Sequence, residues 1–232
     1  MKFHSKVFFQ INLKIILFLI LSSIIFSSIA YIFPSKFPDI KGSLAYYFSL
    51  GNENNVPTAY AGLSILLSSL ILYVNYLLEK SKNKKYFKYL TFIFLYIATD
   101  EVFDLHNKVS KFFDFGDNLS IFYYSWVIPY GIFTIVALLF FYKFFLTFKT
   151  KIRNLIFLAG LLFILGEIGF EMLSGHLVSS YGHPDLLTQP LLFINEFFIL
   201  IEESFGLLGI LIFNYALLLN IENKKLKILI LN

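Results

Sequence analysis

The chain has 232 residues, 58% of them hydrophobic and 15% charged, and its mean hydropathy is +0.74. Soluble domains contain about 45–50% apolar and about 25% charged residues. The composition therefore argues against a water-soluble globule and indicates an integral membrane protein. The absence of cysteine excludes a disulfide framework, a thiolate metal site and a cysteine nucleophile.

Six stretches are long and apolar enough to cross a bilayer, since a transmembrane helix needs about 20 mostly apolar residues. They cover about 11–33, 58–78, 86–106, 121–148, 154–176 and 191–220. The connections between them are too short for a soluble domain. We therefore predict an all-α, polytopic membrane protein, a bundle of six transmembrane helices forming a single domain over residues 1–232.

The first stretch has a second interpretation. Basic residues, an apolar run and Ser28-Ile29-Ala30 resemble a secretory signal peptide with its cleavage site. The apolar run is longer than the usual core of a signal peptide, so we favour a membrane span. Cleavage would leave five helices and an external N-terminus.

The distribution of Lys and Arg predicts the orientation. Of the 19 Lys and Arg residues, 15 fall in the N-terminal arm, the second and fourth connections and the C-terminal tail. Because short cytoplasmic loops carry the excess of these residues, both termini are predicted on the cytoplasmic side of the membrane. The net charge of +4 therefore reflects the predicted orientation in the membrane. The expected partners are membrane lipids rather than nucleic acid.

The third stretch carries acidic residues inside an apolar helix: Asp100, Glu101 and Asp104, followed by His106 and Asn107. A charged side chain at the centre of such a helix costs about 2.5–3.5 kcal/mol on insertion scales. Asp100, Asp104 and Asn107 have i, i+4, i+7 spacing, which places them on one face of a continuous helix. The predicted stripe is therefore a candidate for a buried polar site.

Aromatic residues gather near the outer end of the fourth stretch, namely Tyr123, Tyr124, Trp126 and Tyr130. Trp and Tyr are enriched at membrane–water interfaces, so we expect these side chains to form an aromatic belt. Pro129 predicts a kink in the same helix.

The fifth and sixth stretches carry further acids. The fifth holds Glu167 and Glu171 at i, i+4 spacing, and His176 near its outer end; the sixth holds Asn195, Glu196, Glu202 and Glu203. At about 1.5 Å per residue, the acids of the three helices lie at similar heights, between the middle and the outer half of the bilayer. Three polar stripes at one height predict a shared interior cavity.

Glycines continue the polar stripe of the sixth stretch, at Gly206 and Gly209. They would let a neighbouring helix approach closely. The alternative to a functional site is that the acids are protonated and hydrogen-bonded between helices for packing alone.

Three segments resemble motifs of a family of uncharacterised bacterial integral membrane proteins. DEVFDLHN at 100–107 is similar to its DExxxLHE helix, GEIGFE at 166–171 to its glycine-rich helix, and EESFGLLG at 202–209 to its EExxExxG helix. Asn107 and Gly206 each stand where the family pattern has Glu, which removes two carboxylates. The resemblance implies that these positions form a site and implies no activity.

The first hypothesis for this site is a divalent metal centre open to the outside. Carboxylates with imidazole suit Zn, Mn, Fe or Mg, and a bound metal could activate water to hydrolyse a lipid-like substrate. The predicted ligands are Glu101, His106, Glu171 and Glu202, with Glu203 as the base. Further buried polar residues of the site are Asp100, Asp104, Glu167, His176 and Asn195.

Two other hypotheses remain open, so the sequence does not decide whether the protein is an enzyme. The same acids could titrate and carry protons or cations. The protein could also be a non-catalytic subunit of a larger membrane complex, or a homo-oligomer.

Overall fold

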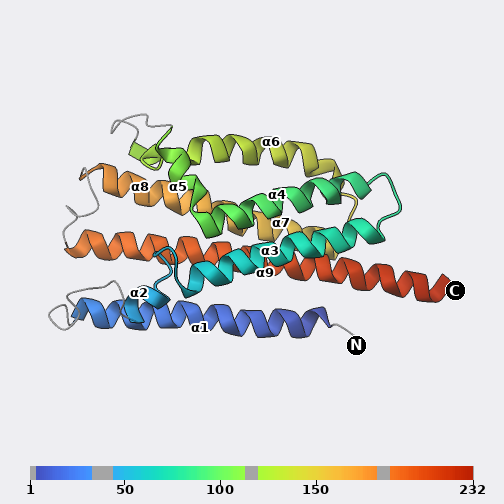
Figure 1. Cartoon of the computed structure of the whole chain (residues 1–232), viewed down its shortest axis with the longest axis horizontal. Coiled ribbons are helices and arrows are strands. Elements are labelled where there is room, and N and C mark those ends of the chain that lie inside the picture. Colours follow the sequence, from blue (N-terminus) through green and yellow to red (C-terminus); the bar gives the residue numbers. More distant parts are fainter. Residues whose placement is uncertain (1–3, 33–43, 113–119, 182–188, 232) are drawn as a thin grey trace.

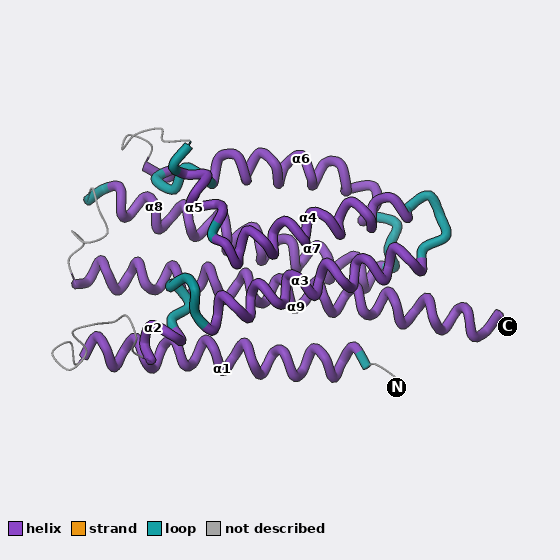
Figure 2. The backbone as a smooth tube through the Cα atoms, viewed as in Figure 1, coloured by secondary structure: helices purple, strands orange, loops and turns teal. Residues whose placement is uncertain are grey.

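The computed structural model describes residues 4–32, 44–112, 120–181 and 189–231, and every regular element within these ranges is helical (Figures 1 and 2). The elements are α1 (Ser5–Ile32), α2 (Leu44–Phe48), α3 (Val56–Leu78), α4 (Lys84–Phe103), α5 (Leu105–Ser110), η2 (Ser120–Phe122), α6 (Val127–Phe145), α7 (Thr150–Ile164), η3 (Leu165–Phe170), α8 (Glu171–Ser179) and α9 (Gln189–Leu231). The expectation of an all-α chain is confirmed for these ranges.

The long helices run side by side, with α9 through the middle of the bundle, α1 along one side and α6 along the opposite side (Figure 1). The N-terminus and the C-terminus lie at the same end. The connections from α3 to α4 and from α6 to α7 also lie at that end (Figure 2). These are the segments that carry the predicted excess of positive charge.

Within the described part of the chain, five helical segments are long and apolar enough to cross a membrane: Ser5–Ile29, Val56–Leu78, Val127–Phe145, Thr150–Ser179 and Pro190–Lys224. The sixth predicted span corresponds to α4, which lies beside the others (Figure 1). Charged residues occupy both ends of α4, from Lys84, Lys85 and Lys88 to Asp100 and Glu101. Length and composition therefore support five spans, and α4 runs antiparallel to α3 beside them, so that both termini lie at the same end of the bundle (Figure 1).

Three local features differ from those predicted from the sequence. The stretch 86–106 breaks at Asp104, whose backbone is left-handed with φ 52°. The stretch 154–176 contains a π-helical turn, η3. The predicted kink at Pro129 is wrong, because α6 begins at Val127 and a proline in the first turn of a helix blocks no hydrogen bond.

Amide side chains join α3 to α9 in the core. Asn75 donates to the carbonyl oxygens of Ile71 and Leu217, and Asn220 donates to Asn75 Oδ1 over 2.8 Å. Asn214 donates to the Ser64 carbonyl oxygen over 3.1 Å. Without water, such side chains bond between helices, so these amides align the two central helices.

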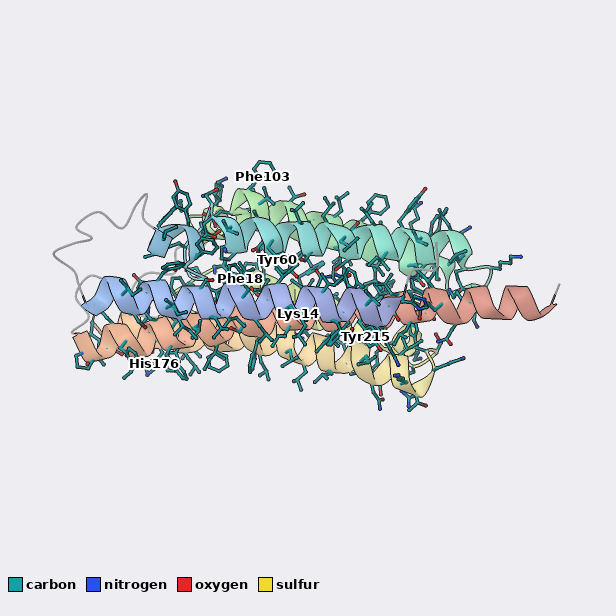
Figure 3. All side chains as sticks on the ribbon, turned by 90° about the horizontal axis from the view of Figure 1, so that it is seen from below. Lys14, Phe18, Tyr60, Phe103, His176 and Tyr215 are labelled. Carbon is teal, nitrogen blue, oxygen red and sulfur yellow. The ribbon has the colours of Figure 1, made fainter. Side chains whose placement is uncertain are left out.

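The first helix packs along α9 through one face only. Ile16 and Leu19 are buried, while Lys14 and Phe18 lie on the exposed face of α1 (Figure 3). At the start of α1, the Ser5 N–H and hydroxyl both donate to the Glu222 carboxylate of α9. This contact satisfies one of the amide groups that a helix N-terminus leaves without an intrahelical acceptor.

An ion pair closes the end of the bundle where the two termini lie. Lys224 Nζ of α9 lies 2.7 Å from Glu79 Oε2, at the C-terminus of α3. Burial opposes ionisation of Glu79, but Lys224 and the Ser81 N–H outweigh it and lower the pKa of Glu79 to about 2. The carboxylate thus stabilises the fold at neutral pH.

We expect Glu79→Gln to lower the free energy of unfolding in detergent by about 1 kcal/mol at neutral pH, since the pair is partly exposed and screened. A depressed folded-state pKa stabilises the protein above the unfolded-state value and ceases to do so as the pH falls toward 2. The parent and the variant should therefore converge in acid. Thermal unfolding across pH measures the difference, and an equal difference at all pH values would contradict the assignment.

Candidate functional site

Most of the acids that the sequence places in apolar helices line one cavity of about 1010 Å³. It reaches α4, η3, α8 and α9, and its lining includes Asp100, Glu101, His106, Glu167, Glu171, Glu202 and Glu203. Seven residues from the three predicted stripes thus share one space. The connection between α2 and α3 contributes a further acid, Glu53.

Toward the end of the bundle opposite the two termini, which we call the outer end (Figure 1), one ligand atom each from Glu53, Asp104 and His106 lies within 4.8 Å of the other two. The His106 ring stands between two carboxylates, with Nδ1 3.5 Å from Asp100 Oδ2 and Nε2 3.5 Å from Asp104 Oδ1. We call Glu53, Asp104 and His106 the outer triad. Two carboxylates and an imidazole are a ligand set that could bind a divalent metal.

The break in the third predicted helix produces this arrangement. The left-handed backbone of Asp104 ends α4 and starts α5, so Asp104 and Asn107 do not continue the regular stripe expected on one helix. Instead, Asn107 Nδ2 donates to Asp104 Oδ1 over 2.7 Å. Asp tolerates the left-handed conformation better than most residues. Here the left-handed turn at Asp104 brings the His106 ring back toward the Asp104 carboxylate.

Glu53 was missed by the sequence analysis because it lies in a predicted external connection rather than in a span. A network around Asn55 shapes this segment: Asn55 Nδ2 donates to the carbonyl oxygens of Tyr46 and Ser49, and Asn55 Oδ1 accepts from the Thr58 N–H. Burial raises the pKa of Glu53, His106 opposes the rise, and Asp104 and Asp100 add to it. A bound cation would relieve this cost.

The aromatic side chains at the start of α6 face the acids, so the expected role in an interfacial belt is wrong for two of them. Trp126 is only 7% exposed, and its Nε1 donates to Glu171 Oε1 over 3.1 Å. The Tyr130 hydroxyl donates to Asp100 Oδ1 over 3.1 Å and pairs with the Tyr96 hydroxyl. Hydrogen-bond donors placed this way hold two of the carboxylates in position.

Two acids of the cavity lie against each other. The carboxyl groups of Glu171 and Glu202 lie close enough to interact, and two such groups form a hydrogen bond with each other when one of them carries a proton. Glu202 is 8% exposed, and its Oε2 has no hydrogen-bond partner among the described residues. A buried oxygen without a donor is costly, so this atom is suited to accept a hydrogen bond from a ligand.

Two glycines allow η3 and α9 to pack closely around the side chain of Glu167. A Cβ on Gly206 would overlap Glu167 Oε1, and a Cβ on Gly166 would lie 2.6 Å from the Glu202 carbonyl oxygen. The expected close approach at the glycine face of the sixth stretch is therefore present, between η3 and α9. Gly206 stands where the motif described above has a glutamate, and its missing side chain makes room for a carboxyl from another helix.

Three predicted site residues lie outside the cavity lining: Asp104, which belongs to the outer triad, His176 and Asn195. His176 is exposed and contacts the Ser120 hydroxyl, on the outer surface of α8 (Figure 3). Asn195 is buried and accepts from the Ser174 hydroxyl over 2.8 Å, so it joins α8 to α9. The four predicted metal ligands all line the cavity, but His106 alone among them belongs to the outer triad.

Comparison with known proteins identifies the family. Residues 15–221 match a domain of unknown function, DUF8692. The chain belongs to this family. No curated protein and no solved structure matches the chain. The DUF8692 region includes the whole acidic lining of the cavity, and its description assigns no activity, so the case for a function rests on the geometry.

The glycine contact yields a stability prediction. Replacing a helical Gly by Ala normally stabilises a helix by about 1 kcal/mol, and Gly131→Ala in α6, where a Cβ meets nothing within 4 Å, should show this gain. Gly206→Ala should not show this gain, because the new Cβ forces the end of the Glu167 side chain to move, and a net loss of up to about 1 kcal/mol is expected. The combination with Glu167→Ala should recover most of the loss. Thermal unfolding in detergent tests this, and similar shifts for the two glycine variants would contradict the contact.

Proposed function

We propose that this protein holds a divalent cation at Glu53, Asp104 and His106 and uses it to hydrolyse a lipid-like substrate from the membrane. The observation that carries the proposal is the convergence of these three ligand atoms within 4.8 Å at the outer end of the acid-lined cavity. Carboxylate and imidazole ligands favour Zn, Mn, Fe or Mg. Three ligands leave positions for water and substrate.

Electrostatics supports a cation at this place. Glu53 interacts electrostatically with Glu101, Glu167 and Glu203 as well as with the acids around His106. His106 is the one basic side chain among the residues described as lining the cavity. Buried charge without a partner is costly, so a divalent ion would offset more of this negative charge than protonated His106 alone.

The chemistry then follows the general pattern of metal-assisted hydrolysis. A metal lowers the pKa of bound water and polarises the bond under attack. A cavity carboxylate such as Glu203 would accept the proton of that water, the hydroxide would add to the acyl or phosphoryl centre, and the leaving group would depart with the proton. With both termini in the cytoplasm, this reaction would occur at the outer side of a bacterial inner membrane.

A second candidate is proton or cation transport, which the close pair of Glu171 and Glu202 favours. Coupled carboxyls of this kind can pass a proton between them. The rest of the lining favours the enzyme. At the end of the cavity nearer the chain termini, the wall consists of apolar residues such as Phe141, Phe145 and Phe213, whereas a path for ions needs polar groups. Flux measured in proteoliposomes separates the two functions, since hydrolysis requires no net transfer of ions across the bilayer.

The outer triad predicts where the metal binds. Glu53→Gln, Asp104→Asn and His106→Ala should each weaken binding of Zn²⁺ or Mn²⁺ at least tenfold, the usual effect of losing a metal ligand or its close support. Asn tolerates the left-handed backbone at position 104, so that variant removes charge with little strain. Calorimetric titration of the purified protein, together with elemental analysis, gives the affinities.

The matched controls are His176→Ala and Glu196→Gln, which change the same residue types outside the cavity lining. Both should bind metal as the parent does. Parent-like affinity in all three triad variants, or no metal binding by the parent, would refute the assignment.

The metal affinity should also depend on pH. Burial raises the pKa of Glu53, and a carboxyl and an imidazole must both lose their protons to act as ligands. The affinity is therefore expected to rise between about pH 5 and about pH 8. Glu53→Gln should reduce this dependence, and an unchanged pH profile in that variant would exclude Glu53 as a ligand.

A further inference from the structure

We propose that the same cavity binds a single amphiphile, with its alkyl chain between α4, α6 and α7 and a hydroxyl or amine head group among the acids. The inference concerns the head group and chain that the cavity recognises, and it rests on the proposed function only where such an amphiphile carries an acyl or phosphoryl group to be hydrolysed. The binding site itself follows from the cavity and is testable without any metal.

The first argument is the shape of the space. At one end, α6 is held by aromatic contacts, with the ring of Phe144 5.1 Å from those of Tyr86 and Phe87. At the other end, the Tyr130 hydroxyl is bonded to Asp100. Tyr130 and Phe141 both line the cavity and lie about 17 Å apart along the helix. The cavity is therefore elongated along α6, as an alkyl chain requires.

The second argument is the distribution of polarity along this space. The acids lie at its outer end, whereas the part between α6 and α7 is lined by side chains such as Phe133, Leu138 and Phe163. An apolar cavity of this size left empty would forfeit the dispersion contacts of its walls. A hydrocarbon chain from the surrounding lipid supplies those contacts, and water does not.

The third argument concerns the head group. Glu202 Oε2 is buried and has no hydrogen-bond partner among the described residues, and Glu202 lines the cavity beside Glu171. An unpartnered acceptor is satisfied by a hydroxyl or ammonium donor. A carboxylate head would bring a like charge to a group of acids and is disfavoured. The cavity thus discriminates between head groups on chains of equal length.

Two glycines supply a matched pair of variants. A Cβ at Gly160 of α7 would meet nothing within 4 Å, and Gly160 lines the cavity. A Cβ at Gly131 of α6 would also meet nothing, but Gly131 is not part of the lining. Gly160→Leu therefore adds a branched side chain to the chain site from a position where its Cβ meets no atom, and Gly131→Leu makes the same chemical change elsewhere.

The experiment uses hexadecan-1-ol with a diazirine in mid-chain as the probe, on the full-length protein in lipid nanodiscs. Photolabelling should saturate with probe concentration and map to peptides of α4, α6 and α7. Gly160→Leu should lower this labelling several-fold, while Gly131→Leu keeps it. The equivalent diazirine hexadecanoic acid should label more weakly than the alcohol.

Thr134→Phe gives a second test should Gly160→Leu fail to fold, because it narrows the same space from α6. Equal labelling of the cavity-filling and control variants, or unsaturable labelling spread over α1, would show bulk lipid and overturn the proposal. Equal labelling by acid and alcohol would overturn the assigned head group.

The test also separates this inference from the proposed function. Asp104→Asn, which changes a triad residue outside the cavity lining, should weaken metal binding at least tenfold and keep the labelling, whereas Gly160→Leu should keep metal binding and lower the labelling several-fold. A protein that binds no metal but is labelled saturably refutes the metal centre and supports the amphiphile site. A protein that binds metal at the outer triad without saturable labelling refutes the amphiphile site alone.

Discussion

The burial of many carboxyl groups in an apolar helical bundle is the constraint on which the rest of the structure depends. An acid in such surroundings must find a donor, a proton or a cation. Tyr130 donates a hydrogen bond to Asp100, and Trp126 donates one to Glu171. The carboxyl groups of Glu171 and Glu202 interact with each other. These contacts determine how α4, α6, α8 and α9 face one another, so the acids organise the outer half of the bundle.

Two departures from regular helix follow from the same constraint. The left-handed residue Asp104 ends α4 and turns His106 toward the acids. The π-helical turn η3 carries Glu167 against Gly206. Irregular backbone in a membrane is tolerated where it borders protein or a cavity, and π-helical turns are frequent at functional sites. Both irregularities border the cavity, which favours a functional explanation over packing alone.

The inner half of the bundle is held together differently. Amides on α3 and α9 and stacked aromatic rings between α4 and α6 provide its contacts. Since α6 is held near its two ends, the space between them stays open. A polar site at one end of an apolar space can hold a head group and a chain at once, which links the proposed reaction to substrates already dissolved in the bilayer.

The sequence by itself determined the all-helical architecture, the approximate helix positions and the gathering of acids in one space, because hydropathy and helical spacing are local properties that survive folding. Only the tertiary structure decided which atoms meet. Glu53 reaches the site from a connection, and His106 meets Asp104 through a break in the helix. Trp126 and Tyr130 turn inward. These contacts depend on backbone turns and on neighbouring helices, and no periodicity in the sequence records them.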